Sequence, residues 1–434
     1  MIRSSRRPAR PTRRNLNRLW FAQSTSLVGL QTGSVAVPLL AVDVLHADAS
    51  QVALIGTVSS LPWLVAPLIG TIADRTRRKR LLVTSHLGRA GLWLTIPAAY
   101  AIGRLTMQQV WIVSALAGLL GVVFAVGHRA FLPTILAAED LGAANGRMGG
   151  TDAAARATGP ALAGYLTQFV GAIWSVVVQV AASVLAGIAT VGIRPDQPGS
   201  YEPDDDHRIS TRTTWWRGIV DGFRCVYEIK PLRWLAIVET GYLFFFDLVF
   251  AIVVVFFRNT LGLGAAAIGV IFSAGSLGGV LAALMTNRIR VRIGLDRSIK
   301  ITAILRGVAI AVFPLSLLVP GHIGVIAVLV GGRGVNACAW SVYEVLSDTY
   351  QQTRLPEEKR GSAIAAILWA GNLAATVGSA GAAALATTLD PTALLSAAGV
   401  GAVVAGCLSL MISTGAPDGP ATPRLRRTHR DRLG

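Results

Sequence analysis

The sequence Gly70-Thr-Ile-Ala-Asp-Arg-Thr-Arg-Arg-Lys-Arg80 connects two long apolar stretches, residues 51–73 and 81–103, and begins within the last turn of the first. It is strongly basic from position 75 onward. A bilayer span needs about 20 mostly apolar residues, so each neighbouring stretch is long enough to cross a membrane. This arrangement predicts a short charged loop between two transmembrane helices.

Apolar stretches of this length continue along the whole 434-residue chain, which is 53% hydrophobic and 15% charged. Soluble domains carry about 25% charged residues, so soluble, fibrous and disordered classes fit this composition poorly. The 46 glycines are read as close contacts between membrane helices. The twelve candidate spans are residues 19–45, 51–73, 81–103, 108–135, 146–168, 172–193, 234–257, 264–286, 299–319, 322–345, 362–387 and 392–413.

Basic residues gather in both tails and in alternate loops. These regions hold 33 of the 40 Lys and Arg residues, whereas the intervening loops hold only Arg104 and Arg258. The positive-inside rule then predicts an even number of spans with both termini in the cytoplasm. The net charge of +17 is therefore attributed to orientation in a cell membrane and to anionic lipids on its cytoplasmic face, not to nucleic acid.

The chain repeats itself, because Ile55-Gly56 recurs as Ile268-Gly269 and Asp74-Arg75 corresponds to Asn287-Arg288. Two halves of six spans each are typical of transporters with a parallel repeat. The first apolar run is too long for a signal peptide, so we expect an uncleaved first helix. The predicted organisation is a basic tail (1–18), an N-terminal six-helix bundle (19–193), a cytoplasmic linker (194–233), a C-terminal six-helix bundle (234–413) and a second basic tail (414–434).

The linker contains two different segments. Residues 195–213 are polar and acidic, which is typical of a flexible connection. The following segment places Trp215, Trp216, Ile219, Phe223 and Val226 on one helical face and charged residues on another. This pattern predicts an amphipathic helix on the cytoplasmic membrane surface, with a partner-docking helix as the alternative.

Residues 70–80 resemble the loop 2–3 signature of the major facilitator superfamily, G-x-x-x-D-R-x-G-R-[RK], although Arg77 replaces its second glycine. The resemblance covers residues 15–413. It implies an all-α integral membrane protein with twelve transmembrane helices in two pseudo-symmetric six-helix bundles.

The same resemblance implies a gating role for this motif. Gly70 would allow close helix packing, and Asp74 would face the start of span 11 near Gly361. Arg75 and Arg78 would bridge to cytoplasmic acids and hold the inner gate shut. The alternative is that these charges only determine topology.

A second motif, Gly159-Pro160-Ala-Leu-Ala-Gly164, resembles the antiporter signature G-P-x-x-G-G of exporters in the superfamily. Its proline and small residues would let span 5 bend and slide against span 8, and a simple proline kink is the alternative. The segments 17–29 and 356–361 are similar to the macrolide-efflux and siderophore-exporter branch. That branch often has an acid where this chain has Leu30, and the span 4 arginine motif of proton antiporters is absent.

Ionisable residues inside spans are costly, so each is a functional candidate. Asp247, amid aromatic residues near the middle of span 7, is the leading proton carrier or cation-binding acid, and a structural pair with Arg333 is the alternative. Glu239 lies on approximately the same face. Further proton- or substrate-binding candidates are Arg333, Gln31, Asn336, Trp340, Trp369 and Asn372, although the aromatic residues also suit helix packing.

Two other sets of charged residues lie inside predicted spans. Asp152 and Arg156 lie four residues apart and are expected to neutralise each other, although both are kept as binding candidates. Arg89 and Arg306 occupy matched positions in spans 3 and 9, where they are candidates for gating or snorkelling residues.

These patterns predict a monomeric secondary transporter that exports an amphipathic or hydrophobic small molecule in exchange for protons. An importer or lysophospholipid flippase of the same fold is one alternative, and a transport-dead membrane sensor or scaffold is another. The sequence has no nucleotide-binding loop, zinc signature or catalytic motif, so we expect no cofactor, no metal and no enzymatic activity.

Overall fold

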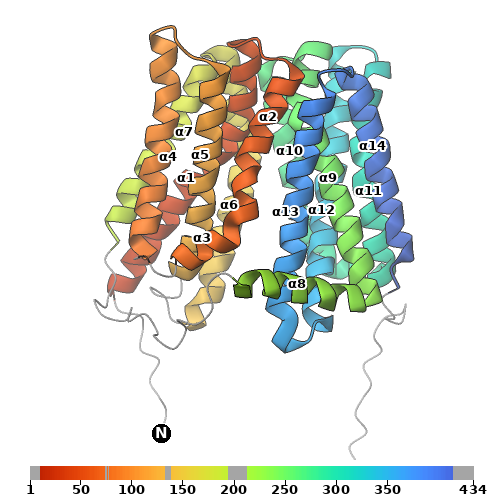
Figure 1. Cartoon of the computed structure of the whole chain (residues 1–434). Coiled ribbons are helices and arrows are strands. Elements are labelled where there is room, and N and C mark those ends of the chain that lie inside the picture. The colour runs from red at the N-terminus through yellow and green to blue at the C-terminus, as the bar shows by residue number, and fades with distance from the viewer. Residues whose placement is uncertain (1–9, 74–75, 77, 132–137, 194–212, 414–434) are drawn as a thin grey trace, which may run out of the picture.

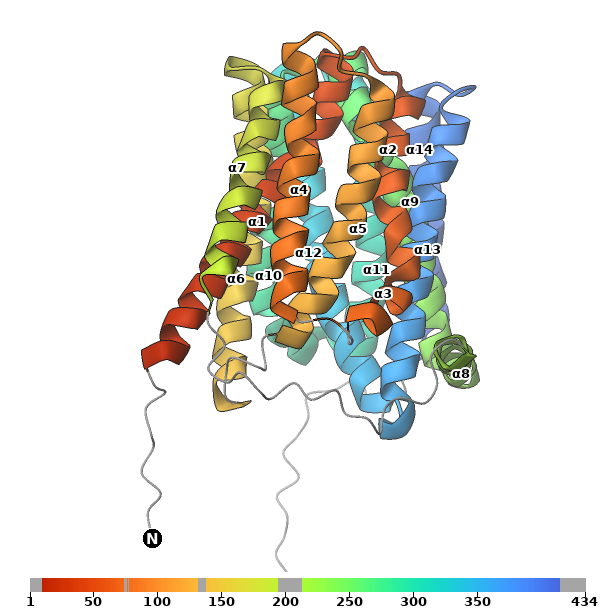
Figure 2. The same ribbon diagram turned by 60° about the vertical axis from the view of Figure 1, so that its left-hand side comes forward.

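The computed structural model describes residues 10–73, 76, 78–131, 138–193 and 213–413, and every regular element in these ranges is helical. The long helices run roughly along one axis, and α8 lies across one end of the bundle (Figure 1, Figure 2). Their bounds are α1 (Arg10–Asp43), α2 (Ala49–Ser60), η1 (Leu61–Val65), α3 (Ala66–Ala73), α4 (Arg78–Ala101), α5 (Met107–Phe131), α6 (Ala138–Phe169), α7 (Ala172–Val191), α8 (Thr213–Glu228), α9 (Lys230–Val255), η4 (Phe256–Thr260), α10 (Ala265–Ile293), α11 (Leu295–Leu315), η5 (Ser316–Leu318), α12 (His322–Arg354), η6 (Glu357–Lys359), α13 (Arg360–Leu385), α14 (Pro391–Cys407) and η7 (Leu408–Met411).

The helices form two halves that lie side by side in Figure 1. In the N-terminal half, α1 packs on α6 and α7, and α4 packs on α5 and α7. In the C-terminal half, α9 packs on α13 and α14, and α11 packs on α12 and α14. When α2, η1 and α3 are taken as one interrupted span, each half has the six spans expected from the repeat.

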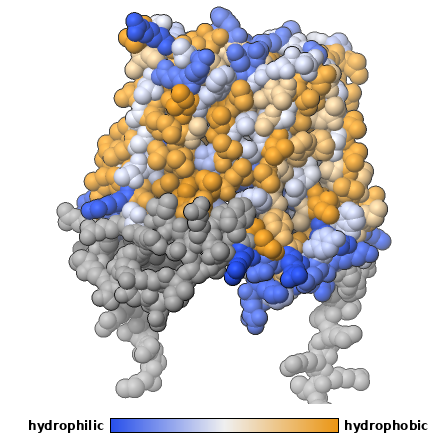
Figure 3. Space-filling view, in the orientation of Figure 1, coloured by the Kyte–Doolittle hydropathy of each residue, from blue (hydrophilic) through white to orange (hydrophobic). Residues whose placement is uncertain are grey.

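The surface shows the division expected of a membrane protein. Hydrophobic side chains form a broad band between hydrophilic ends in Figure 3. In the described residues, 10 helices are long and apolar enough to cross a bilayer. The long helices α4 and α6 are not among them, because they carry charged and polar residues such as Arg89, Asp152 and Arg156.

Several helices extend beyond the predicted spans. α1 begins at Arg10, so part of the predicted basic tail 1–18 is helical, and α12 continues to Arg354. Hydropathy marks the part of a helix that crosses the apolar slab. It does not mark the end of the helix, since Arg, Gln and Glu are good helix formers.

The predicted second span is not one continuous helix. α2 ends at Ser60, a 3₁₀ turn follows, and α3 begins at Ala66. Pro62 and Pro67 explain the interruption, because proline has no N–H to donate and its ring clashes with the preceding turn. Trp63 lies in this interruption and lines a cavity between the two halves.

α8 forms the predicted amphipathic helix, but part of its apolar face packs against protein. Ile219, Cys225 and Val226 are buried. A Cβ added to Gly222 would lie 2.2 Å from the carbonyl oxygen of Ser362, so α8 touches α13 directly. The side chains of Trp215 and Trp216 and residues 194–212 lie outside the described part of the chain.

Candidate functional site: a cavity between the two halves

A cavity of about 580 Å³ lies between the halves, and its wall carries four acids. Glu239 and Asp247 come from α9, and Glu344 and Asp348 come from α12. No Lys, Arg or His is among the described residues that line it. The other half contributes Gly56, Ser59, Ser60 and Trp63 from the region where α2 is interrupted.

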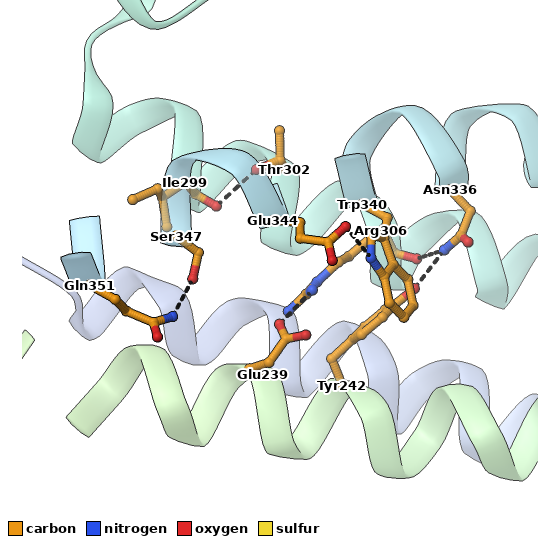
Figure 4. A network of polar contacts seen from close by, with 10 residues as sticks. All are labelled: Glu239, Tyr242, Ile299, Thr302, Arg306, Asn336, Trp340, Glu344, Ser347 and Gln351. Carbon is orange, nitrogen blue, oxygen red and sulfur yellow. Dashed lines mark hydrogen bonds and ion pairs between the residues drawn. The ribbon is translucent and has the colours of Figure 1, made fainter. Parts of the chain in front are cut away.

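One of these acids has a buried partner, as Figure 4 shows. Glu239 Oε2 lies 2.8 Å from Arg306 Nη1, and the Arg306 side chain is completely buried. The guanidinium also lies over the rings of Tyr242 and Tyr343, at 3.9 and 3.8 Å from their centroids. Arg306 is therefore a neutralised and tightly packed cation, and its burial argues against snorkelling.

Behind the wall, Asn336 connects several polar groups. Its Nδ2 donates to the Tyr242 hydroxyl at 2.8 Å and to the Arg306 carbonyl oxygen at 3.0 Å. Its Oδ1 accepts a hydrogen bond from Arg333 Nη1 at 2.8 Å. Neither Asn336 nor Arg333 lines the cavity. The structure therefore places these two predicted binding residues in a supporting network.

Asp247 lies on the cavity wall together with Trp340 and Asn372, two other predicted residues. Among the described residues, no ion pair to Asp247 is formed. Arg333, its proposed structural partner, instead contacts Asn336 and lies over the Phe250 ring. Asp247 thus differs from Glu239, because none of the described cations neutralises it.

Other candidates predicted to bind protons or substrate lie outside this cavity. Gln31 packs against Gly159 of α6. The Trp369 indole N–H donates to the Leu64 carbonyl oxygen at 3.2 Å, which joins the two halves. Asp152 and Arg156 form the expected pair at 2.8 Å. These contacts place the four residues outside this cavity, and their proposed binding role stays a prediction.

Sequence reasoning missed Glu344 and Asp348. The predicted tenth span, residues 322–345, contains Glu344 and ends before Asp348, and neither acid was named as a candidate. α12 continues to Arg354, so both residues lie on this helix beside the cavity. The available signal was their spacing from Trp340, whose indole N–H donates to Glu344 Oε2 at 3.2 Å.

The gating motif is described only in part. Asp74 and Arg75 lie outside the described residues, and the side chain of Arg78 at the start of α4 is also outside them. Gly70 is in α3, and Gly361 is in the first turn of α13. The gating role of these residues stays a prediction.

The antiporter-like motif lies where α6 crosses α10 of the other half. A Cβ on Gly164 would be 2.4 Å from the Ala265 carbonyl oxygen, and one on Gly269 would be 2.5 Å from the Pro160 carbonyl oxygen. The Ala161 N–H donates to Ser273 Oγ at 2.8 Å. This contact joins the fifth and eighth spans, as expected for the motif.

Gly164→Ala should therefore separate α6 from α10, because the new methyl group would meet the backbone of α10. Such overpacking typically costs about 1–3 kcal/mol. We expect a lower melting temperature of the purified protein in detergent. Gly150→Ala on the same helix is the control, since a Cβ there meets nothing within 4 Å. Equal melting temperatures for the two variants would contradict this prediction.

The halves are also joined at the end of the bundle opposite α8. Arg258 Nε in η4 lies 2.8 Å from Asp43 Oδ1 at the end of α1. Ser50 Oγ donates to the Ala383 carbonyl oxygen at 2.6 Å. An ion pair and a direct hydrogen bond therefore hold α1 and α2 to the C-terminal half at this end.

A second cavity, of about 610 Å³, is enclosed mainly by the N-terminal half. Arg89 lies on its wall and is only 6% exposed, so it does not snorkel either. This cavity shares Gly56, Ser59 and Trp63 with the first one. The two cavities consequently meet at the interrupted second span.

Comparisons with known proteins support one family. The family model described as Major Facilitator Superfamily matches residues 19–379. A bacterial homologue of the iron transporter ferroportin, solved in an inward-facing state, has a TM-score of 0.70 at 16% identity, covering 92% of this chain and 98% of that one. The nucleoside transporter NupG has a TM-score of 0.66 at 14% identity, covering 92% and 98%. A bacterial homologue of the lysosomal transporter Spinster, also inward-facing, has a TM-score of 0.63 at 12% identity, covering 94% and 95%. A search of curated proteins finds no match.

Proposed function

Since the chain belongs to the major facilitator superfamily and has its multi-pass helical fold, we propose that it exports an amphipathic or hydrophobic small molecule in exchange for protons. The observation that carries this proposal is the acid-lined cavity between the halves. A binding cavity at the interface of two repeats is what alternating access requires.

The contacts between the halves support an alternating-access cycle. The Asp43–Arg258 pair and the Ser50–Ala383 hydrogen bond lie at the end opposite α8. We take the α8 end as cytoplasmic, because most basic residues of the sequence fall on that side of the predicted topology. In this proposal, the present conformation is closed toward the outside. Breaking these contacts would let the halves rock and expose the cavity there.

Proton coupling is assigned to Asp247. Its carboxyl lies on the cavity wall without a neutralising cation among the described residues. A carboxyl that is held in a membrane protein without a partner favours a functional explanation over a structural one. Protonation from the outside and release to the cytoplasm would alternate with substrate binding between the two halves.

Export is favoured by the α6–α10 crossing, whose small residues allow the close sliding contact expected of the antiporter-like motif. A secondary mechanism is favoured by the sequence, which has no nucleotide-binding loop to supply energy. We propose that the protein is not an enzyme for the same reason, since no catalytic motif is recognisable.

A disulfide across the halves tests this proposal. A Cβ built on Gly56 of α2 lies 3.7 Å from the Ser379 side-chain Cβ of α13. This separation is within the usual range of about 3.5–4.5 Å for disulfides. With Cys225, Cys338 and Cys407 replaced by Ser, the pair Gly56→Cys/Ser379→Cys should crosslink on oxidation. Transport should then stop, because the two halves can no longer separate here.

The transport assay would use a labelled compound found by comparing accumulation in cells with and without the protein. Reductant should restore transport by the double variant. Each single cysteine variant, treated with the same oxidant, is the control for an effect of the new side chain. Undiminished transport by the fully crosslinked protein would exclude movement of α2 against α13 and therefore the proposed cycle.

A further inference from the structure

Arg89 and Arg306 are repeat-related arginines that differ in one respect. Arg306 in α11 forms an ion pair with Glu239 at 2.8 Å. Arg89 in α4 is 6% exposed, yet no carboxylate among the described residues forms an ion pair with it. Its Nε has no hydrogen-bond partner there, which is also true of Arg306 Nε and Nη2, so the ion pair is the difference between the two arginines. Within the described part of the chain, Arg306 thus has a neutralising carboxylate and Arg89 does not.

The described surroundings of Arg89 include several polar side chains. Its cavity is lined by four further side chains that each bury a polar atom without a hydrogen-bond partner in the described part of the chain. No Asp or Glu is among the described lining residues. The unpartnered atoms are Gln23 Oε1, Trp93 Nε1, Ser114 Oγ and Gln179 Oε1.

A buried cation without a partner is unfavourable, because the protein has removed its hydration without replacing it. A carboxylate or phosphate oxygen would supply both the missing charge and acceptors for the guanidinium. The Trp93 N–H and the Ser114 hydroxyl add neutral donors to the same wall. The guanidinium, the indole N–H and the hydroxyl therefore complement an anionic head group, while the two glutamine oxygens can accept hydrogen bonds from a neutral donor elsewhere on the ligand.

The rest of the wall suits an apolar body. Leu27, Leu30, Trp63 and Phe124 line the same space. Ligand cavities of this kind are mostly apolar, with a few polar groups that orient the ligand. From these observations, and resting on the proposed transport function, we infer that the substrate is an amphipathic organic anion whose head group binds Arg89.

This inference separates the substrate from the proton-binding acids. The Arg89 cavity meets the acidic cavity at Gly56, Ser59 and Trp63. An anion is attracted to Arg89 and repelled by the acids across that junction. The bound anion would occupy the N-terminal side, and the coupling proton would occupy the C-terminal side at Asp247.

Three naphthalene probes that differ only in their head groups test this assignment. They are 2-naphthoate, neutral 2-naphthamide and the cation of 2-naphthylmethylamine. Binding to the purified full-length protein would be measured by isothermal titration calorimetry in detergent. We expect the wild-type protein to bind the carboxylate most tightly and the cation least tightly.

Arg89→Gln should weaken 2-naphthoate binding by about 30-fold or more, as the loss of one partner of a buried charge pair does. Binding of 2-naphthamide should change less than about twofold, since it carries no charge to pair. Arg89→Lys should keep a preference for the carboxylate. The matched control is Arg104→Gln, which alters an exposed arginine in the loop between α4 and α5.

Three results would overturn the inference. The first is no preference of the wild-type protein for 2-naphthoate over the cation, and the second is no binding of 2-naphthoate at millimolar concentration. The third is an equal loss of carboxylate and amide binding in Arg89→Gln, which indicates a packing role. If Arg89→Gln does not fold, the inference is tested by the order of wild-type affinities for the three probes. It is also tested by whether Arg89→Lys keeps its preference for the carboxylate. Transport that survives the Gly56–Ser379 crosslink contradicts the proposed cycle and leaves this binding result unaffected.

Discussion

Asp247→Asn is expected to reduce proton-driven uphill transport to the level of vesicles without the protein. An asparagine amide cannot take up and release a proton as a carboxyl does. The fold should remain intact, because no cation among the described residues pairs with Asp247 and would lose its partner. The measurement is accumulation of a labelled transported compound in inverted vesicles with an imposed pH gradient.

The same vesicles provide the controls for this experiment. Asp247→Asn should still exchange labelled for unlabelled compound without a gradient, since the rest of the cavity is unchanged. Asp152→Asn should accumulate the compound like the wild-type protein, because Asp152 lies outside both cavities and pairs locally with Arg156. Full gradient-driven accumulation by Asp247→Asn would remove this residue from the mechanism. Accumulation that persists in the presence of an uncoupler would show that a proton gradient does not drive transport.

Glu239→Gln is expected to have the largest effect on stability. It leaves the guanidinium of Arg306, whose side chain is completely buried, without its carboxylate. Breaking a buried ion pair at one partner typically costs about 3–5 kcal/mol. Because the Glu239 side chain is 24% exposed toward the cavity, we expect the lower end of this range. The free energy of unfolding in mixed detergent micelles would measure the loss.

A double-mutant cycle separates the ion pair from the packing around it. Glu239→Gln/Arg306→Gln should be more stable than Glu239→Gln alone, because no uncompensated charge remains. Asp152→Asn is the matched control, since its partner Arg156 is four residues away and has a side chain that is 59% exposed. Such a pair contributes at most about 1 kcal/mol. Equal stability of Glu239→Gln and the wild-type protein would contradict a stabilising role for the pair.

Part of the candidate site could be predicted from helix periodicity. Asp247 and Glu239 were placed on approximately one face of one helix, and both line the same cavity. The periodicity could not predict the partners of these acids. Arg306 is 67 positions from Glu239 along the chain and reaches it from another helix. The neighbours of Gln31 and Trp369 could not be predicted for the same reason, since they belong to α6 and η1.

The sequence by itself determined the membrane-spanning class, the two-part repeat and the predicted side of the basic loops. These features depend on hydropathy and charge along the chain, which the bilayer selects span by span. Only the tertiary structure decided that Glu239 neutralises Arg306, that Asp247 faces an acidic cavity, and that Arg89 has no described carboxylate partner. Those outcomes depend on how helices from distant parts of the chain cross, and the period of one helix carries no information about its neighbour.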